Sequence, residues 1–322
     1  MHRMVWIVLG WGLAFSIAVS LYLRLVGITN LVGAALVGLT PLLVIPLVML
    51  FASAWMSYHG PLRIVALVLA VWYFFTFTFV GSIFGCGADD PATLTHSDDE
   101  ISIYNHNVFY LEGNPAEVAA AIIEADPDVI VLQEVWPGFI AALENEVSLT
   151  RYRFRANEPR DSALGLATWS RWPIDEARMH SPAANPVLTT VIDGPGSLHG
   201  NGSFTVHNVH TTAPQVSSSQ WDDDLEALAR TDRTNPSIMS GDFNASSDHR
   251  QFRSILESGW TDVHEPKGCG FDATWPSGAL SPTPLLRLDH VLVTNHFHVH
   301  DTRIGQAAGS DHRAVITKIH FE

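Results

Sequence analysis

The N-terminal part of the chain contains three long apolar runs without a charged side chain. They cover residues 4–23, 31–55 and 64–84. Each run is long enough to cross the hydrocarbon layer of a bilayer, which takes about 20 apolar residues in a helix. A helix satisfies its own backbone hydrogen bonds where water is absent, so the sequence predicts three transmembrane helices.

Two other interpretations of these runs are weaker. The first run follows Arg3, as in a cleavable signal peptide, but it is longer than the usual apolar core and two more runs follow it. Buried helices of a soluble protein rarely lack charge on every face. A transporter is disfavoured because the spans hold no charged residue. We therefore expect a multi-pass anchor in the cell membrane over residues 1–86.

Three arginines predict on which side of the membrane the remainder of the chain lies. Arg3 and Arg63 would lie on one side of the three spans and Arg24 on the other. Because Lys and Arg favour the cytoplasmic side, we expect the rest of the chain to be extracytoplasmic.

The remainder of the chain is strongly acidic. From Asp89 onward it holds all 33 acidic side chains and 15 of the 18 basic ones, a net charge of −18. Nucleic-acid binding usually requires a basic surface, so this balance disfavours a nuclease. A local group of arginines leaves that alternative open: Arg151, Arg153, Arg155 and Arg160.

An acidic linker is expected over residues 87–100. Its run Asp98-Asp99-Glu100 resembles a metal site, but no apolar neighbour fixes these carboxylates, so we interpret it as solvated. Cys86 and Cys269 neither require nor exclude a disulfide.

After the linker, strand-like and helix-like segments alternate, which predicts one α/β domain over residues 101–322. The expected strands are 101–108, 129–132, 164–169, 204–209, 237–239, 288–294 and 314–319. The expected helices are 115–125, 138–146, 218–230 and 247–258.

Several of these strands stop at polar residues, which is costly in a core unless the group is solvated, paired or bound to a ligand. Asn107 and Glu134 end the first two strands, and an amide oxygen with one carboxylate suits Mg²⁺. Asp242 and Asn244 follow a later strand two positions apart, so they lie on one face and can align a water and hold a phosphate oxygen. Ser246, Ser247 and Asp248 stand where a helix begins and are explained by capping.

The C-terminal strands carry a third group of polar residues. Asp289 begins one strand, and Asp311 and His312 precede the last. A carboxylate on one imidazole nitrogen fixes the tautomer and raises the basicity of the other, so Asp289 is a candidate partner for His312 as general base. His210 ends another strand immediately before a loop.

In order along the chain, the segments NHNV, DVIVLQEV, HNVHTTAP, GDFNA, RLDHVLV and SDHRAV resemble the motifs of the endonuclease/exonuclease/phosphatase family. LGLATWSRWPI is similar to a further strand of that family. The resemblance runs from about residue 101 to residue 321. It implies a four-layer α/β sandwich with a DNase-I-like fold, in which two packed mixed β-sheets are flanked by outer helices.

The resemblance also implies roles for the polar residues. Glu134 resembles the principal metal ligand, with Asn107 beside it and Asp311 completing the site. Asp242 resembles the residue that orients or deprotonates the attacking water, and Asn244 a phosphate-holding partner. His312 resembles the phosphate-contacting or general-base histidine, and Asp289 resembles its carboxylate partner. His210 resembles the second histidine of the nuclease branch.

One departure from the family limits this transfer. The acidic residue that some members carry just after the first motif is absent, because Phe109 and Tyr110 follow Val108. The metal is therefore expected to have few carboxylate ligands. We expect Mg²⁺, with Mn²⁺ and Ca²⁺ as alternatives.

The expected function is hydrolysis of a phosphoester or pyrophosphate bond. Anchoring raises the effective concentration of substrates in the same bilayer, which favours a lipid-linked phosphate. Three spans followed by this domain are similar to the actinobacterial VanJ-like, teicoplanin-resistance-associated subgroup. A membrane-tethered nuclease and a catalytically inactive membrane scaffold are the alternatives.

Overall fold

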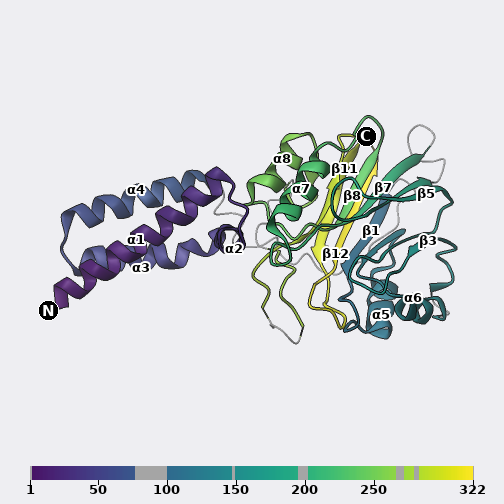
Figure 1. Ribbon diagram of the computed structural model, residues 1–322, viewed down its shortest axis with the longest axis horizontal. Helices are drawn as coiled ribbons and strands as arrows, with labels where there is room; N and C mark the ends of the chain where they lie inside the picture. The colour runs from purple at the N-terminus through teal and green to yellow at the C-terminus, as the bar shows by residue number, and fades with distance from the viewer. Residues whose placement is uncertain are drawn as a thin grey trace.

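The computed structural model describes residues 2–76, 100–146, 149–194, 202–265, 272–278 and 283–321. A bundle of apolar helices, here called the head, projects from one side of a domain built of strands and helices (Figure 1). Residues 77–99 and 266–271, which include Cys86, most of the expected linker and Cys269, lie outside the described residues. The linker up to residue 99 and the disulfide question therefore stay untested predictions. Glu100, expected as the solvated end of the linker, instead begins strand β1 (Glu100–Asn107), and its Oε2 lies 3.7 Å from Lys318 Nζ.

Two six-stranded sheets form the centre of the domain, and both mix parallel and antiparallel pairs. The first has the order β11 (Phe297–Ile304), β12 (Val315–Phe321), β1 (Glu100–Asn107), β2 (Val129–Gln133), β4 (Leu166–Ser170), β3 (Phe154–Glu158). The second has the order β5 (Ile174–His180), β6 (Val187–Asp193), β7 (Ser203–His210), β8 (Ser237–Asp242), β10 (Asp289–Val293), β9 (Thr261–Asp262).

Four helices complete the layers. They are α5 (Pro115–Ala125), α6 (Pro137–Glu144), α7 (Ser218–Ala229) and α8 (Arg250–Glu257). The pair α5 and α6 packs with Tyr104 and Trp169 on the first sheet, whereas α7 and α8 pack with Met239 and Leu292 on the second. The predicted α/β sandwich is confirmed.

Alternation along the strands separates the two sides of each sheet. Ile101 and Ile103 of β1 face Ile238 and Val291 of the second sheet in the central apolar layer, while Tyr104 faces the helices. Because side chains alternate along a strand, the same parity that buries Ile103 carries Asn107 to the inter-sheet side at the strand end. The core thus determines where the polar strand ends point.

The head departs from the expected three continuous spans. Its helices are α1 (His2–Val26), α2 (Leu31–Gly38), η1 (Thr40–Leu43), α3 (Val44–Met56) and α4 (Gly60–Thr76). Among the described residues, α1 is the one helix long and apolar enough to cross a membrane, and α2 with η1–α3 would make a second span bent by 61°. The bend lies near Pro41, which cannot donate a helical hydrogen bond. Apolar helix α4 is shorter, and the run expected to end at residue 84 continues outside the described residues.

The head is docked on the α/β domain. Arg24 Nε lies 2.8 Å from Asp248 Oδ1, and His249 Nε2 lies 2.9 Å from the carbonyl oxygen of Ala34. Ala34 is itself buried in the apolar cluster under α7 and α8. The capping role expected for Asp248 is wrong, because α8 begins after His249 without a side-chain cap and Asp248 binds the head instead.

Candidate active site

The polar strand ends predicted from the sequence meet at one edge of the two sheets. In the second sheet His210 pairs in register with Asp242, which pairs with Asp289 on the next strand. In the first sheet Asn107 ends β1 opposite the end of β2, where Glu134 follows. The structure thereby brings together residues that are up to about 200 positions apart.

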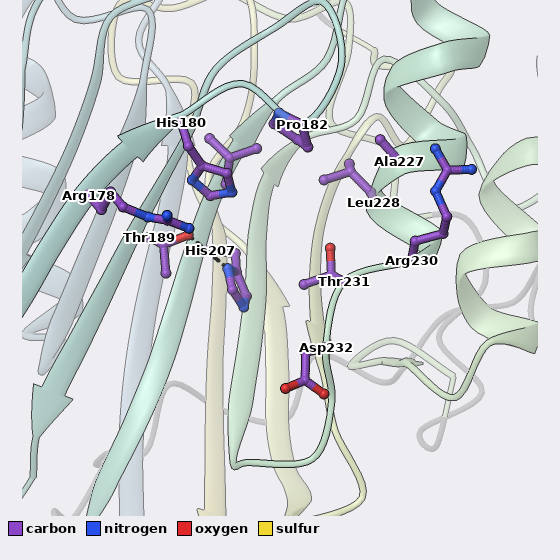
Figure 2. Close-up of a pocket in the computed structure, with 11 residues that line it drawn as sticks. Arg178, His180, Pro182, Thr189, His207, Ala227, Leu228, Arg230, Thr231 and Asp232 are labelled. Carbon is purple, nitrogen blue, oxygen red and sulfur yellow. Dashed lines mark hydrogen bonds between the residues drawn. The ribbon is translucent and has the colours of Figure 1, made fainter.

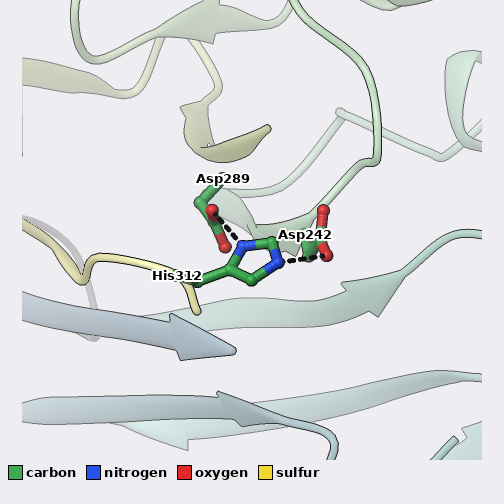
Figure 3. A group of neighbouring side chains, drawn as sticks. All are labelled: Asp242, Asp289 and His312. Carbon is green, nitrogen blue, oxygen red and sulfur yellow. Dashed lines mark hydrogen bonds and ion pairs between the residues drawn. The ribbon is translucent and has the colours of Figure 1, made fainter. Parts of the chain in front are cut away.

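A buried carboxylate–imidazole pair lies at the centre of this edge (Figure 3). His312 Nδ1 donates to Asp289 Oδ2 at 2.8 Å, and the other ring nitrogen, Nε2, lies 3.7 Å from Asp242 Oδ2. All three side chains are buried. One ring nitrogen is therefore held, and the other faces the site.

The charges of this group are interdependent. Burial by itself lowers the pKa of His312, but the carboxylates of Asp289 and Asp242 outweigh it and raise that pKa to about 10. The pKa of Asp242 is also raised, chiefly by burial, against the opposing effect of His312. The imidazole is therefore positively charged near neutral pH, which suits contact with a phosphate oxygen.

Asn107 joins the two sheets at the site. Its Nδ2 donates to Glu134 Oε1 and to Asp242 Oδ2, each at 3.0 Å. The second oxygen of Glu134 accepts the backbone N–H of Tyr110 at 2.7 Å. Both carboxylates are thus oriented before any substrate arrives.

Asp311 extends the acidic side of the site. Its Oδ2 accepts a hydrogen bond from Trp275 Nε1 at 3.1 Å. Burial and the nearby carboxylates of Glu134 and Asp242 raise its pKa, against the opposing effect of His312. A cation beside Asp311 would offset this unfavourable environment of its carboxylate. Asp311 and Glu134 offer carboxylate oxygens of the kind that Mg²⁺ takes, and the amide oxygen of Asn107, which accepts the backbone N–H of Phe109 at 3.0 Å, lies beside them. The residues present fit the expected metal.

A second group of potential ligand atoms is less suited to a metal. Asp242, Asp289 and His312 each offer one ligand atom within 4.8 Å of the others. A metal between them would have to replace the hydrogen bond from His312 Nδ1 to Asp289. The hydrogen bond therefore argues against a metal between these three side chains.

His210 and Asn244 also reach the site. His210 Nδ1 donates to the carbonyl oxygen of Ala163 at 2.9 Å, and its Nε2 lies 3.7 Å from both Glu134 Oε1 and Asp242 Oδ2. Asn244 Nδ2 donates to the carbonyl oxygen of Thr211 at 3.1 Å and lies 3.4 Å from Asp242 Oδ2. All eight predicted site residues are therefore gathered at this edge, and their roles stay predictions.

The backbone around the site is strained. Among the described residues, seven that are not glycine have positive φ, and four of these are site residues or follow Asn107 closely: Phe109, Leu111, Glu134 and Asn244. Left-handed backbone costs on the order of 1–3 kcal/mol per residue and is retained mainly at functional positions. Its presence at Glu134 and Asn244 supports assigning both to the site.

A polar layer directly beneath the site was not predicted. Gln133 Nε2 donates to Asn105 Oδ1 at 3.1 Å and to Asn208 Oδ1 at 2.9 Å, and Ser240 Oγ donates to Asn105 Oδ1 at 3.0 Å. Asn105, Asn208 and Ser240 each stand two positions before a site residue, so they face the same side. This spacing is the sequence signal that could have revealed them.

Two further supports for His312 were also missed. His106 Nε2 lies 3.2 Å from the carbonyl oxygen of His312, and burial lowers the pKa of His106 to about 4, so its ring is neutral. Ser310 Oγ donates to the carbonyl oxygen of Asn107 and accepts the backbone N–H of His312. Both lie inside the motifs that carried the family resemblance.

A separate cavity of about 400 Å³ lies on the outer side of the second sheet, between its strands and the end of α7 (Figure 2). His180 and His207 line it with Arg178 and Arg230. Burial and the nearby His180 outweigh Asp232 and lower the pKa of His207 to about 4. None of the predicted site residues lines this cavity, so we place no catalytic step there.

Comparison with known proteins identifies the family of the domain that carries this site. A model of the endonuclease/exonuclease/phosphatase family matches residues 104–312, which span every predicted site residue. The chain belongs to this family. By its name the family comprises nucleases and phosphatases, which are hydrolases acting on phosphoester bonds.

Solved structures share the fold of this endonuclease/exonuclease/phosphatase domain. A family member from Beutenbergia cavernae is 19% identical over 69% of this chain and 72% of its own, with a TM-score of 0.53. A humanized D. rerio TDP2 is 18% identical over 70% and 100%, with a TM-score of 0.53. A mannosyl-6-phosphatase from Bacteroides thetaiotaomicron is 16% identical over 69% and 100%, with a TM-score of 0.51. No curated protein matches the sequence.

Proposed function

We propose that this protein is a membrane-anchored, metal-dependent phosphoesterase that hydrolyses a phosphoester or pyrophosphate bond of a lipid-linked substrate. The observation that carries the proposal is the free Nε2 of His312, which faces Asp242 at 3.7 Å while Nδ1 is held by Asp289. Phosphoester hydrolysis needs an aligned water and stabilised charge on the phosphate oxygens. The site offers groups for both.

The residues divide this work according to their contacts. Asp242, fixed by Asn107 and by the backbone N–H of Asn244 at 2.8 Å, is placed to orient the water and accept its proton. His312 Nε2 donates to a phosphate oxygen or to the leaving oxygen, and Asp289 keeps its ring aligned. Asn244 and His210 approach the same phosphate from the second sheet.

Glu134, Asn107 and Asp311 would hold the divalent metal, expected to be Mg²⁺. A bound divalent ion neutralises charge on the phosphate as it develops. Glu134 is already oriented for this by Asn107 and by the backbone N–H of Tyr110.

The head supports a lipid-linked substrate. Helix α1 is long and apolar enough to cross a membrane, and the acidic charge of the remainder disfavours a polyanionic ligand. The similarity to the VanJ-like subgroup and the placement of Arg3 and Arg63 favour a multi-pass protein whose catalytic domain is extracytoplasmic.

A membrane-tethered nuclease is the second candidate. The observation that favours it is His210, which resembles the second histidine of the nuclease branch and lies at the site with Nε2 3.7 Å from Asp242. An inactive scaffold is disfavoured by the complete set of site residues.

The test uses the full-length protein in lipid nanodiscs. A polyprenyl pyrophosphate, a phospholipid and duplex DNA are offered side by side with Mg²⁺, Mn²⁺ or Ca²⁺, with and without EDTA. Turnover of a lipid substrate that EDTA and His312→Ala abolish supports the proposal. The matched control is His300→Ala on edge strand β11, whose side chain is 60% exposed, and this variant should retain activity. Cleavage of DNA alone would instead establish the nuclease.

A further inference from the structure

Exposed apolar side chains outside the head gather around the active site. Among the described residues from 100 onward, five large hydrophobic side chains are exposed: Leu111, Ile123, Leu164, Val216 and Leu285. Single exposed apolar residues are normal on a protein surface. Four of these five, however, lie on loops at the edge of the sheets that carries the site. We call Leu111, Leu164, Val216 and Leu285 the apolar rim.

Two rim residues lie on loops that follow site residues. Leu111, 63% exposed, comes one position after Tyr110, whose N–H binds Glu134. Its φ of 63° is unfavourable for a leucine. Val216, 77% exposed, lies in the loop that begins after His210 at the end of β7.

The other two rim residues lie on loops that lead into site strands. Leu164 follows Ala163, whose carbonyl oxygen accepts the hydrogen bond from His210 Nδ1. Leu285 donates its N–H to Trp275, and Trp275 in turn binds Asp311. Leu111 and Leu164 are thus next in sequence to residues that bind the site, Leu285 is linked to it through Trp275, and Val216 lies on a loop that leaves it.

The rim is continuous with the head. Leu286, next to Leu285, packs against Gly38 at the end of α2. Helix α2 exposes Leu31, Val32 and Leu36 on the apolar surface that the head presents. The loop that carries Leu285 therefore contacts the apolar head.

We propose that the apolar rim binds the hydrocarbon chain of an amphiphilic phosphoester while its phosphate occupies the site. This inference rests on the proposed function, because it names the part of the substrate that adjoins the scissile phosphate. The partner is a lipid chain, since aliphatic side chains on four loops offer apolar contact and no charge. The hydrocarbon chain would move from water onto the rim as the phosphate enters the site. Because a longer chain buries more apolar surface, the rim favours long-chain substrates.

The first experiment does not require turnover. Full-length protein in phosphatidylcholine nanodiscs is irradiated with a long-chain alkyl phosphate that carries a diazirine in its chain, and the adducts are mapped by mass spectrometry. Adducts in loops 108–114, 159–165, 211–217 and 283–288, suppressed by unlabelled dodecyl phosphate, are expected. Adducts confined to residues 2–76 would overturn the proposal. Rim adducts that dodecyl phosphate does not suppress would indicate bilayer contact and would also overturn it.

The second experiment compares two alkyl phosphoesters with the same reacting phosphate and a long or a short chain. In the double variant Leu111→Ser, Val216→Ser we expect kcat/KM for the long chain to fall roughly tenfold more than for the short chain, as lost apolar contacts typically give. Ile123→Ser, exposed on α5 away from the rim, is the matched control and should change neither value. Equal losses for both chains would contradict the proposal. If the wild type hydrolyses neither ester, the proposed function fails, and the crosslinking still decides the rim.

Discussion

Two buried histidine–aspartate pairs lie side by side in this domain, and they differ in one respect. Asp289 and His290 are consecutive in β10, so their side chains point to opposite faces of the sheet. On one face Asp289 holds His312 Nδ1 and leaves Nε2 toward the site. On the other, His290 Nδ1 lies 2.7 Å from Asp262 Oδ2 and its Nε2 lies 2.9 Å from the carbonyl oxygen of Ala245.

The comparison shows that the pairing itself does not indicate catalysis. His290 has both nitrogens occupied by oxygens of the fold and packs against Phe243 and Phe252. Asp262 is held further by His264 Nδ1 at 3.1 Å. The pair at His290 is thus suited to stabilise the fold, whereas the pair at His312 has a nitrogen free for substrate.

The largest expected effect tests the catalytic pair. His312→Ala should lower kcat by roughly 10²–10⁴-fold, the usual contribution of a positioned acid or base. The change is measured with the lipid substrate at saturating metal, and the circular dichroism spectrum should remain that of the folded protein. Activity that survives this substitution would remove His312 from the mechanism.

The structural pair should respond in the opposite way. Asp262→Ala should lower the free energy of unfolding by roughly 3–5 kcal/mol, because it leaves buried partners unpaired. Burial opposes the charged form of Asp262, but Arg287 and His290 outweigh burial and hold its pKa well below 3.8. Its contribution is therefore present above about pH 4 and lost as the pH falls further.

Denaturant unfolding at pH 7 and at pH 3.5 measures this effect, since the variant should lose less stability between the two than the wild type. The kcat of the folded fraction should remain within a few-fold of normal. A loss of kcat as large as that of His312→Ala would mean that both pairs serve catalysis.

A smaller effect is expected from the polar layer beneath the site. Gln133→Leu leaves the Asn208 Oδ1 acceptor unpaired, while Asn105 Oδ1 keeps its hydrogen bond from Ser240, and the loss costs roughly 1–3 kcal/mol of stability. Glu134 is the next residue in the chain, so the substitution should also displace the Glu134 carboxylate. Because small displacements of catalytic groups slow the reaction, we expect kcat to fall about tenfold. Unchanged kcat in the folded fraction would show that the layer is only structural.

All but one of the central strands could be predicted from the sequence, but the edge strands could not. The expected strands correspond to β1, β2, β4, β7, β8, β10 and β12. The four edge strands β3, β5, β9 and β11 were missed, together with β6. An edge strand such as β5 exposes most of its residues, so it lacks the apolar run that marks a buried strand.

The residues of the site could be predicted from the sequence, but contacts between distant parts of the chain could not. Each site residue interrupts an apolar run, which is a local signal. The role of Asp248 depends instead on Arg24, which lies more than 200 positions away and contacts it only after folding. The bend between α2 and η1 was likewise hidden, because an uncharged run with Pro41 reads as one span.

The smallest expected effect concerns another buried histidine, His249, whose nitrogens are both occupied at the joint with the head. Nδ1 accepts the N–H of Ser246 at 2.9 Å, and Nε2 donates to the carbonyl oxygen of Ala34 at 2.9 Å. Burial lowers its pKa, so the folded protein keeps the ring neutral while the unfolded chain protonates it near pH 6.5. This part of the stability is present above about pH 6.5 and is lost as the pH falls, by at most about 1.4 kcal/mol per pH unit.

Thermal unfolding in nanodiscs at pH 7 and pH 5 measures this contribution. His249→Asn cannot take up a proton, so the difference in Tm between the two pH values should be smaller for the variant than for the wild type. In the folded protein His312 stays charged between pH 5 and pH 7, whereas His249 stays neutral and gains a proton only on unfolding. The comparison therefore distinguishes a histidine of the site from one that attaches the head. An identical pH response in both proteins would mean that the joint contributes nothing to acid sensitivity.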